Sequence, residues 1–423
     1  MKIEKFLEAE NETSNKVLMC VSQPILPGAT LGIFGGGQLG RMFALAAFQL
    51  GYKVHVFSPQ QDCPAGEVAT LHTVADYHDC AAVTRFSQSV DVITLEFENV
   101  PAEALETAAR FSPVRPSGRV LHITQDRLRE KHFLQQSGIA CTRFAPVKSK
   151  ADLEIARTEV GTPAVLKTCR SGYDGKGQVV VRSPEEAAKA WHSLGEVAAV
   201  WEAMVDYQCE LSVLVARSAG GDVACYPPIT NHHVNHILDI STLPSKETGP
   251  GKESEFTEAT SDLEKNHPFA TAACESTSAK IARTIAEQLD LVGLACIEFF
   301  LTREDDQLLV NEIAPRTHNS GHLTIEACVC SQFEQQVRAI CGLPLGCPIP
   351  QSSAAMANLL GERWSAGVPD WQAALAEGDI HLHLYGKKES RPGRKMGHLT
   401  ALAQTPAAAR KQVCTARAKL LKA

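Results

Sequence analysis

The stretch CIEFFLTREDDQLLVNEIAPR, residues 296–316, contains two apolar segments that each carry a glutamate and that flank a polar centre. Segments of this kind are typical of two β-strands joined by a short loop, here residues 303–307. If residue 305 is the centre of a hairpin loop, Glu298 lies directly opposite Glu312 on the neighbouring strand. The stretch therefore predicts a hairpin in which two carboxylates face each other.

Two carboxylates at opposed positions of a strand pair repel each other. A divalent cation removes this repulsion, and Asn311 supplies a further oxygen next to Glu312. A small number of carboxylate ligands, combined with substrate phosphates, suits Mg²⁺. The alternative is a pair of solvated glutamates on an exposed face, which the apolar neighbours in this stretch disfavour. We therefore expect Glu298 and Glu312 to bind Mg²⁺.

The composition restricts the class of protein. A chain of 423 residues is too long for one hydrophobic core, so two or three domains are expected. Its net charge of −7 argues against a nucleic-acid partner, and no apolar stretch approaches the ~20 residues that span a bilayer. The fourteen cysteines form no C-x-x-C pair, so we interpret them as free thiols of a cytoplasmic protein. Residues 1–29 predict a polar, mobile extension rather than a signal peptide.

Strands and helices alternate at the start of the predicted fold. A strand at 31–34, a glycine loop, a helix at 41–50 and a strand at 53–58 follow one another, and the segment DVITLEFENVP at 91–101 adds a further buried strand. Alternation of this kind indicates a parallel sheet with helices on its faces. We therefore expect a doubly wound α/β domain over residues 30–124.

The rest of the chain mixes helices and strands. A helix capped by Thr124 opens this part, and Ser183 with Pro184 starts another helix. The segment 244–268 has almost no apolar residues and predicts a mobile loop. One continuous helix is expected over 321–342, followed by a small tail domain.

The segment GGGQLG at 35–40 matches G-x-G-x-x-G between a strand and a helix. Glycines at this point let backbone N–H groups approach an anion at the start of the helix. A dinucleotide site would need an acidic residue at the end of the next strand, where Ser58 and Pro59 stand. A tight turn without a ligand and a site for another phosphorylated ligand both stay open, and the second is favoured.

The segment SGYDGKGQ at 171–178 lies between two strands and follows Lys167. A plain hairpin would need fewer glycines, because each glycine costs conformational entropy. Backbone N–H groups of such a loop can instead surround phosphates. Further on, Glu202 and Glu210 flank a short link that suits either adenine and ribose recognition or solvated acids at strand ends. The spacing of these two acids alone favours solvated acids at strand ends.

A lysine on a strand, a glycine loop, an acid pair and opposed carboxylates follow one another in this chain, and this order resembles the ATP-grasp superfamily. Several stretches are also similar to the 5-(carboxyamino)imidazole ribonucleotide synthases, the ATP-dependent carboxylating enzymes of purine synthesis. These stretches are GIFGGGQLGRM (32–42), TLEFENVP (94–101), SGYDGKGQ (171–178), NEIAPRTHNSGH (311–322) and LYGK…RPGRKMGHLT (384–400). The similarity covers about residues 30–410.

The resemblance implies an α/β ATP-grasp fold in three parts. A doubly wound N-terminal domain is expected over 30–124, and an ATP-grasp domain over 125–345 that includes a lid at about 145–205. A small C-terminal domain follows over 346–423. The family forms homodimers, so a homodimer is expected, with no nucleic-acid or membrane partner.

The resemblance also implies the chemistry. ATP phosphorylates bicarbonate to give carboxyphosphate and ADP, and the carboxyl group passes to the exocyclic amine of 5-aminoimidazole ribonucleotide. Mg²⁺ is the implied cofactor, and biotin is not required. The enzyme is thus expected to be an ADP-forming carbon–nitrogen ligase of purine biosynthesis.

Individual residues take roles through the same resemblance. The implied catalytic residues are Tyr173, Arg316, Asn319 and Lys387. The implied ATP-binding residues are Arg119, Lys167, Gly172, Tyr173, Asp174, Gly175, Lys176, Gly177, Gln178, Glu202, Ala203, Met204, Val205, Glu210, His233, Asn311 and Glu312. The ribonucleotide is expected at Gly37, Gln38, Leu39, Glu96, Lys387, Arg391 and Arg394, and Mg²⁺ at Glu298 and Glu312.

Other functions make different demands on the sequence. A related ligase that uses formate or glycine would keep the ATP residues and lack RPGRKMGH, and a biotin-dependent carboxylase would need a biotinylated partner. A dehydrogenase would need an acid at Ser58. A non-catalytic protein of this fold is expected to have lost Lys167, Glu298 or Glu312, and all three are present.

Overall fold

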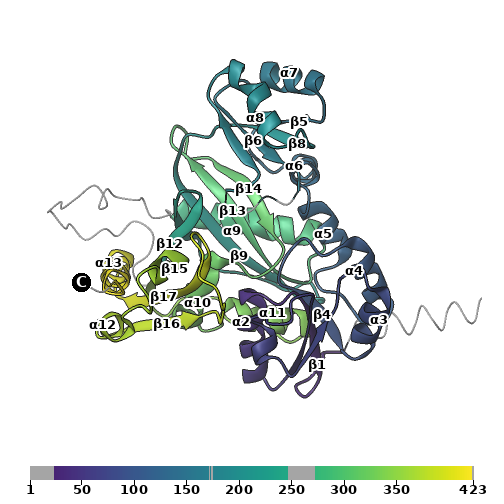
Figure 1. The fold of residues 1–423 in the computed structure, drawn as a ribbon, viewed down its shortest axis with the longest axis vertical. Coiled ribbons are helices and arrows are strands. Elements are labelled where there is room, and N and C mark those ends of the chain that lie inside the picture. The colour runs from purple at the N-terminus through teal and green to yellow at the C-terminus, as the bar shows by residue number, and fades with distance from the viewer. Residues whose placement is uncertain (1–22, 171, 173–174, 246–271, 422–423) are drawn as a thin grey trace, which may run out of the picture.

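The computed structural model describes residues 23–170, 172, 175–245 and 272–421. Within these residues the chain forms three β-sheets with helices packed on them (Figure 1), which agrees with the predicted α/β class. Residues 1–22 of the predicted extension and almost all of the predicted loop at 244–268 lie outside the described residues. No helix in the described part of the chain is long and apolar enough to cross a membrane.

The N-terminal sheet is parallel throughout, as predicted, and has the strand order β3-β2-β1-β4. Its core strands are buried because helices cover the sheet. The strands are β1 (Thr30–Phe34), β2 (Lys53–Ser58), β3 (Leu71–Val74) and β4 (Val92–Leu95). The helices are α2 (Gln38–Gln49), α3 (Cys80–Gln88), α4 (Ala102–Ala109) and α5 (Gly118–Thr124), with the 3₁₀ turn η1 (Gly66–Val68).

The described end of the predicted extension packs against the body of the protein. The Ile25 N–H donates to the Cys341 carbonyl at 2.8 Å, and the Tyr52 hydroxyl donates to the Ile25 carbonyl at 2.6 Å. The Gly28 N–H donates to the Gly51 carbonyl at 2.8 Å. These bonds hold the described residues before β1 in place, in contrast to the mobile extension predicted for residues 1–29.

A nine-stranded sheet forms the centre of the described structure. Its order is β14-β13-β9-β11-β12-β15-β17-β16, with β10 beside β9, and every pairing in it is antiparallel. The strands are β9 (Tyr207–Arg217), β10 (Val223–Cys225), β11 (Ile229–Val234), β12 (Ile237–Leu243), β13 (Gly293–Thr302), β14 (Leu308–Ala314), β15 (Ser353–Leu360), β16 (Ile380–Leu384) and β17 (Lys395–Ala403). The strands of the predicted C-terminal domain therefore extend the same sheet as the central strands.

Helices cover both faces of this sheet. Val213 and Val215 of β9 pack with α9 (Ala272–Gln288), whereas Leu214 of the same strand packs with Leu323 on the opposite face. Since both faces are buried there, residues 213–216 of β9 form a continuous apolar run, and β13 is apolar at most positions. The remaining elements here are α6 (Arg127–Gln136), η4 (Gly361–Trp364), α12 (Trp371–Leu375) and α13 (Pro406–Ala418).

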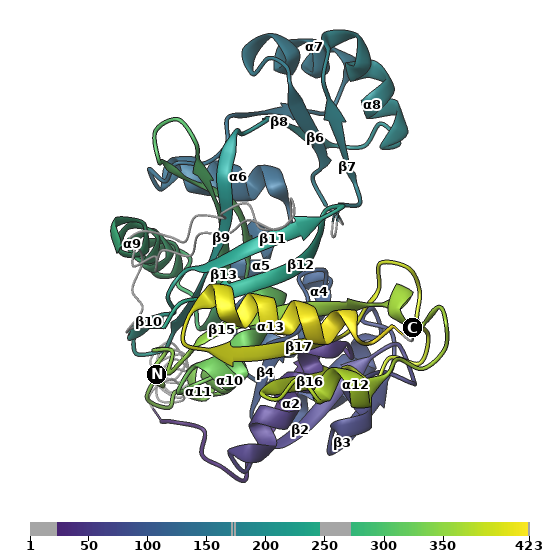
Figure 2. The ribbon, with the colours of Figure 1, turned by 90° about the vertical axis from the view of Figure 1, so that its left-hand side faces the viewer.

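The third sheet forms a separate unit at the opposite end of the molecule from the N-terminal sheet (Figures 1 and 2). Its antiparallel order is β5-β8-β6-β7, with Trp191 and Trp201 in its core. The elements are β5 (Phe144–Val147), α7 (Lys150–Glu159), β6 (Ala164–Thr168), β7 (Gln178–Val181), η2 (Pro184–Glu186), α8 (Ala187–Ser193) and β8 (Ala199–Ala203). The helix predicted to start at Ser183 thus begins with the 3₁₀ turn η2.

Helix α6 is capped by Asp126, and the prediction of Thr124 as its cap is wrong. The Asp126 carboxylate accepts from the N–H groups of Leu128 at 3.1 Å and Arg129 at 3.2 Å. Thr124 is the last residue of α5, and its hydroxyl donates to the Val120 carbonyl. A carboxylate is the better cap here, because it accepts two N–H groups at the positive end of the helix.

The single helix predicted over 321–342 is three shorter pieces. These are η3 (Asn319–Leu323), α10 (Thr324–Ala327) and α11 (Gln332–Cys341). Between α10 and α11 the backbone is extended, because the Val329 and Cys330 N–H groups donate to the carbonyls of Ile349 and Cys347. The hydroxyl of Ser331 then caps α11. Pairing with the segment after α11 therefore replaces helical hydrogen bonds at the break.

Candidate active site

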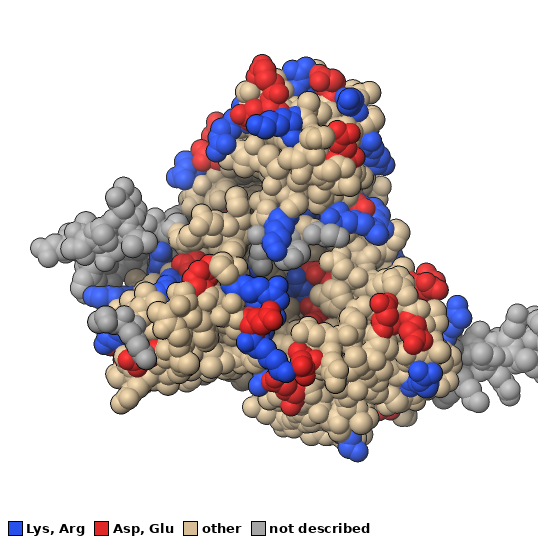
Figure 3. Space-filling model, in the orientation of Figure 1, with Lys and Arg blue, Asp and Glu red and all other residues tan. Residues whose placement is uncertain are grey.

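The three sheets meet around a hollow in the middle of the molecule. Figure 3 shows this hollow with basic and acidic side chains at its edge. The carboxyl ends of β1 and β4 contribute from the N-terminal sheet, β13 and β14 from the central sheet, and β6 with β8 from the third sheet. Most of the residues predicted for ATP and Mg²⁺ are on these elements or on the links that follow them.

Glu298 of β13 and Glu312 of β14 are directly paired in register, which confirms the predicted hairpin. Burial and the neighbouring Glu312 charge raise the pKa of Glu298 to about 7. Burial alone would also raise the pKa of Glu312, but Arg127 and Lys167 outweigh it and lower that pKa. Two converging carboxylates of this kind form a site that gains stability from a cation.

A β-bulge sits next to this pair. Glu298 pairs with Glu312 but Phe299 pairs with Val310, so Asn311 is the extra residue in β14. The bulge places the Asn311 side-chain oxygen 3.4 Å from Lys167 Nζ, and its carbonyl accepts from Lys131 Nζ at 3.0 Å. Asn311 thereby joins the third sheet and helix α6 to the carboxylate pair.

Lys167 and Glu202 form a buried ion pair across β6 and β8. Lys167 Nζ lies 2.9 Å from Glu202 Oε2, and Lys131 Nζ approaches the same oxygen to 3.7 Å. Although burial opposes it, the field of the two lysines lowers the pKa of Glu202 to about 2. The other oxygen, Glu202 Oε1, is buried and has no partner among the described residues. An N–H donor of a ligand would satisfy it.

Helix α6 supplies charged residues that were not predicted for the site. Arg127 Nη1 lies 2.8 Å from Glu312 Oε2, and Glu130 Oε2 accepts the Ile313 N–H at 2.9 Å. Glu130 and Lys131 are almost completely buried. Arg127 and Lys131 are four residues apart and share one helix face, which is the only signal in the sequence that groups them.

The described part of the glycine loop lies close to Arg127 and to the β11–β12 turn. A Cβ on Gly175 would lie 2.5 Å from His236 Cβ, and one on Gly177 would lie 2.6 Å from Thr168 Oγ1. Both glycines have positive φ, 76° and 73°. Only glycine fits these two positions, as the loop prediction requires. Tyr173 and Asp174, predicted for ATP and for catalysis, lie outside the described residues.

Other predicted residues of this loop are described. Gly172 is near Arg127, and a Cβ on it would lie 3.5 Å from Arg127 Nη2. Lys176 is in the turn before β7, and Gln178 opens β7 with its side-chain nitrogen 3.4 Å from His236 Nδ1. The loop therefore spans from Arg127 to the tip of the β11–β12 hairpin.

Glu210 and His233 lie together in the site. His233 Nδ1 is 2.5 Å from Glu210 Oε2, after an irregularity in β11 at 232/233. Burial lowers the pKa of His233, but the bond to Glu210 and its charge raise it overall. The predicted link residues Ala203 and Met204 use their N–H groups for the carbonyls of Arg143 and Pro163, and Val205 follows them.

Arg316 connects the central sheet to the N-terminal sheet. Its Nη2 pairs with Glu98 Oε1 after β4, while its buried Nε has no partner among the described residues. His318, which was not predicted for the site, lies with Nε2 3.1 Å from Glu298 Oε1. Burial and the Arg316 charge lower the pKa of His318 well below its usual value. The imidazole that contacts the Glu298 carboxylate is therefore neutral.

Three predicted residues have other partners. Asn319 and Asn358 exchange side-chain amide hydrogen bonds at 3.1 and 2.7 Å, so Asn319 joins η3 to β15. Arg119 donates to the Gln288 and Leu289 carbonyls at the end of α9. Arg391 is exposed and pairs with Glu389. The structure does not bring these three side chains to the carboxylate pair.

The predicted ribonucleotide residues gather at the start of α2. The Gly37 and Gly40 N–H groups both donate to the half-buried Glu96 carboxylate. Lys387 Nζ donates to Gln38 Oε1 at 2.7 Å and lies 5.4 Å from the centre of the Tyr385 ring. The helix end predicted to hold a phosphate is therefore already bonded to a carboxylate. A phosphate there would have to displace Glu96.

The remaining residues of this region belong to α2 and to the loop between β16 and β17. Leu39 packs with the core under α2. Arg394 donates from Nη1 to the Glu389 carbonyl at 2.8 Å, and Lys388 pairs with Asp62 at 2.8 Å. The C-terminal loop at 386–395 is thus held against the N-terminal sheet, with its cations next to α2.

No cluster of three or more histidine, cysteine or acidic side chains suited to a metal occurs among the described residues. The donor set at β13 and β14 is instead two carboxylates with the Asn311 oxygen nearby. This set fits Mg²⁺ bound jointly by protein and phosphate oxygens, because Mg²⁺ takes few protein ligands and keeps other positions for phosphates and water.

Three family models match successive parts of the chain. A ribonucleotide synthetase preATP-grasp domain matches residues 28–125, and an ATP-grasp domain matches 132–266 and 262–333. A phosphoribosylaminoimidazole carboxylase C-terminal domain matches 354–412. Together they span the three parts of the fold, and they confirm its ATP-grasp class.

Curated proteins and solved structures are similar over nearly the whole chain. N5-carboxyaminoimidazole ribonucleotide synthase of Bacillus subtilis strain 168 is 41% identical over 382 residues, which cover 90% of this chain and 93% of the relative. The N5-carboxyaminoimidazole ribonucleotide synthetase structure from Thermus thermophilus has a TM-score of 0.81 at 38% identity and covers 93% of this chain and 99% of its own.

A further solved structure carries ligands. It is an N5-carboxyaminoimidazole synthase from Aspergillus clavatus in complex with ADP and 5-aminoimidazole ribonucleotide, with a TM-score of 0.78 at 27% identity. The match covers 93% of this chain and 98% of that chain.

Proposed function

Because the chain belongs to the N5-carboxyaminoimidazole ribonucleotide synthase family of ATP-grasp enzymes, we propose that it carboxylates the exocyclic amine of 5-aminoimidazole ribonucleotide. ATP is converted to ADP in this reaction, and bicarbonate supplies the carboxyl group. The enzyme is an ADP-forming carbon–nitrogen ligase of purine biosynthesis. Each substrate has a set of described residues that suits its chemistry.

ATP is assigned to the space between the third sheet and the central sheet. Lys167 and the N–H groups of the glycine loop would face its phosphates, since both surround the hollow next to Asn311. The unpartnered Glu202 Oε1 suits the amino group of adenine, and the Glu210–His233 pair suits the ribose hydroxyls. Ala203, Met204 and Val205 form the link beside them.

Mg²⁺ would be held by Glu298 and Glu312, where it neutralises phosphate charge during phosphoryl transfer. The positive charges of Arg127 and Lys167 lower the pKa of Glu312. This carboxylate is therefore ionised, as a ligand of a cation must be. A bound cation would also favour the ionised form of Glu298.

Bicarbonate is assigned to Arg316. In the first step a bicarbonate oxygen attacks the γ-phosphorus of ATP, ADP leaves, and carboxyphosphate forms. In the second step carboxyphosphate releases phosphate and CO₂, and the amine attacks CO₂ and loses a proton. Arg316 supports both steps, because its guanidinium is always charged and its Nε lacks a partner among the described residues. The phosphate released from carboxyphosphate takes up the proton lost by the amine, because decarboxylation frees a basic phosphate oxygen next to the amine.

The ribonucleotide is assigned to the region between α2 and the C-terminal loop. Since Glu96 already accepts the N–H groups at the start of α2, it suits ribose hydroxyls rather than phosphate. The phosphate would then lie with Lys387 and Arg394 on the C-terminal loop. This assignment revises the expectation that the glycine segment 35–40 holds the phosphate.

The observation that carries the proposal is the directly opposed Glu298–Glu312 pair between Lys167 and Arg316. The test is ADP release measured with and without bicarbonate and 5-aminoimidazole ribonucleotide. Full rate should need both, should need Mg²⁺, and should be insensitive to avidin. Stimulation by formate or glycine in bicarbonate-free buffer would instead favour a related ribonucleotide ligase.

We also propose a cellular compartment and an oligomeric state for the protein. The described cysteines are free thiols, which supports the reducing cytosol as its compartment. A homodimer is also proposed, on the basis of the family resemblance alone.

A further inference from the structure

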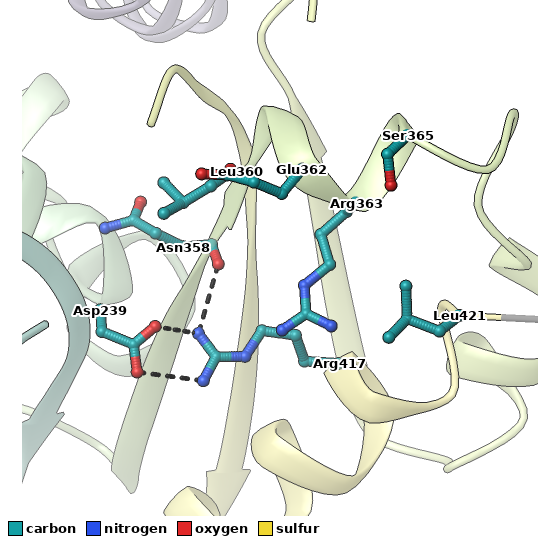
Figure 4. A pocket seen from close by; sticks show the side chains of 8 residues that line it. All are labelled: Asp239, Asn358, Leu360, Glu362, Arg363, Ser365, Arg417 and Leu421. Atoms are coloured by element: carbon teal, nitrogen blue, oxygen red, sulfur yellow. Dashed lines mark hydrogen bonds and ion pairs between the residues drawn. The ribbon is translucent and has the colours of Figure 1, made fainter. Parts of the chain in front are cut away.

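A pocket in the C-terminal part of the chain contains none of the residues predicted for the active site, although its Asn358 bonds to Asn319. It has a volume of about 360 Å³ and lies between β12, β15, η4 and α13 (Figure 4). Its lining residues are Asp239, Asn358, Leu360, Glu362, Arg363, Ser365, Arg417 and Leu421.

One of its two arginines is neutralised by the protein. Arg417 forms a two-bond ion pair with Asp239, in which Nη2 lies 3.1 Å from Oδ2 and Nη1 also bonds Oδ1. Arg417 Nη1 is in addition 3.4 Å from the Asn358 carbonyl. This geometry fixes Arg417 in position, and both carboxylate oxygens of Asp239 are bonded to it.

The second arginine has no such partner. Figure 4 shows the Arg363 guanidinium in the same pocket, beside that of Arg417. Arg363 is half-buried and makes no hydrogen bond or ion pair with any of the described residues. Burial and the Arg417 charge both lower the Arg363 pKa. A half-buried cation beside another cation is unfavourable unless an anion binds there.

Glu362 forms no ion pair with Arg363, and its charge, with that of Asp239, only partly offsets the lowering of the Arg363 pKa. Glu362 Oε1 accepts the Gly393 N–H at 2.8 Å. The acidic residues of the pocket thus have protein partners, whereas the positive charge of Arg363 faces the cavity (Figure 4).

We propose that this pocket binds a small organic oxyanion on Arg363, with Arg417 as the second guanidinium. A phosphate or a carboxylate group has the shape and charge that a guanidinium recognises through paired N–H bonds. The Ser365 hydroxyl is a further polar group at the pocket, and Leu360 with Leu421 provides an apolar wall for the rest of the molecule. The cavity has room for an oxyanion with an organic part, which would lie against the two leucines.

The pocket is joined by backbone hydrogen bonds to the loop that carries Arg394. Besides the bond from Gly393 to Glu362, the Gly361 N–H donates to the Arg394 carbonyl at 2.9 Å. A Cβ on Gly361 would lie 2.1 Å from the Arg391 carbonyl oxygen, so η4 and this loop are in close contact. An anion that moves Arg363 would therefore act on the loop assigned to the ribonucleotide, which makes the pocket a regulatory site. This last step rests on the proposed function.

Binding is tested by calorimetric titration of the full chain with ADP present throughout. Inorganic phosphate and malonate serve as probes, with NaCl at equal ionic strength as reference. The variants are Arg363→Gln and, as matched control, Lys411→Gln, which removes an exposed cation of the same helix as Arg417 outside the pocket. We expect affinity for at least one probe to fall about tenfold in Arg363→Gln and to stay unchanged in Lys411→Gln.

The melting temperature without a probe provides a second measurement. Arg363→Gln should melt at the same or a higher temperature than the natural chain, because the arginine has no partner among the described residues to lose. A lower melting temperature, or equal probe affinity in Arg363→Gln and the natural chain, would overturn the proposal. A response to phosphate alone identifies a phosphate ester as the ligand class, and a response to malonate alone identifies a carboxylate.

The regulatory role is tested by measuring steady-state kinetics with and without the probe that binds. The probe should change KM for the ribonucleotide more than KM for ATP, and Arg363→Gln should lose this change. An equal change in both proteins would mean competition in the active site and would refute the regulatory role. Loss of all turnover in the natural chain would count against the proposed function, while the binding titration would still stand by itself.

Discussion

Glu298 and Glu312 occupy directly opposed positions on the antiparallel strands β13 and β14, and Glu312 helps to raise the pKa of Glu298 to about 7. Both carboxylates are half-buried, and each has a partner in the protein, His318 for Glu298 and Arg127 for Glu312. Their mutual repulsion is the strongest reason to expect a cation between them. It also makes the effects of substituting one of them predictable.

Glu312→Gln should reduce ADP release at saturating Mg²⁺ by about a hundredfold or more, because a charged ligand for the cation is lost at the phosphates. The melting temperature of the metal-free protein should fall modestly, because Arg127 loses its ion-pair partner and this loss outweighs the removal of repulsion from Glu298. The matched control is Glu304→Gln in the exposed loop of the same hairpin. Near-normal ADP release from Glu312→Gln would contradict the assignment of the cation.

The buried Glu130 makes stability depend on pH. Burial and the Glu312 charge raise its pKa to about 8, whereas an unfolded glutamate titrates near ~4.3. Between these values the folded state keeps a proton that the unfolded state loses, so stability should fall as pH rises from about 4.3 to 8. Glu130→Gln should flatten this slope in chemical denaturation measured across the pH range. An unchanged slope would show that Glu130 is ionised in the folded protein.

Lys167 and Glu202 should behave as one unit. Lys167→Met leaves the buried Glu202 carboxylate without its nearest partner, and we expect a loss of stability on the order of 3 kcal/mol. Adding Glu202→Gln removes the uncompensated charge and should restore part of this loss. A double-mutant cycle by denaturant unfolding measures the coupling. Additive effects of the two substitutions would mean that the pair is not coupled.

The C-terminal loop should serve the ribonucleotide and not ATP. Arg394→Ala should raise KM for the ribonucleotide by about tenfold or more, because a charge-assisted bond to its phosphate is lost. KM for ATP should stay nearly unchanged and serves as the internal control. Arg391→Ala should have a smaller effect, since Arg391 is exposed and paired with Glu389. A rise in KM for ATP alone would move Arg394 to the nucleotide site.

The hairpin shows how far a sequence pattern determines a site. Centring the loop on residue 305 places Glu298 opposite Glu312, and this pairing is present. Nearer the loop, however, Phe299 pairs with Val310 and Phe300 with Leu309. A loop centred on residue 305 would instead pair residue 299 with 311 and residue 300 with 310. The bulge at Asn311 restores the register. A bulge depends on contacts from other elements, here Lys167 and Lys131, which strand alternation does not reveal.

The part that helix α6 takes in the site could not be predicted from the sequence, for a different reason. Arg127, Glu130 and Lys131 would normally be assigned to a solvated helix face. They are buried only because β14 and β8 place opposite charges and carbonyl groups against them. The start of α2 is similar, since the pattern of glycines indicates an anion but does not identify it as the protein's own Glu96. For both α6 and the start of α2, the bonding partners are distant along the chain, so no local sequence pattern identifies them.

The continuous sheet across β12 and β15 has a consequence for how the chain holds together. β15 pairs with β12 over residues 354–357, and β17 and β16 follow on its other side. Without them, β12 would be a free sheet edge with unpaired N–H and C=O groups. Such edges recruit strands from other molecules and lead to aggregation. The C-terminal residues therefore shield the central sheet from intermolecular strand pairing, so a fragment ending before β15 should be insoluble even though it keeps every residue assigned to ATP.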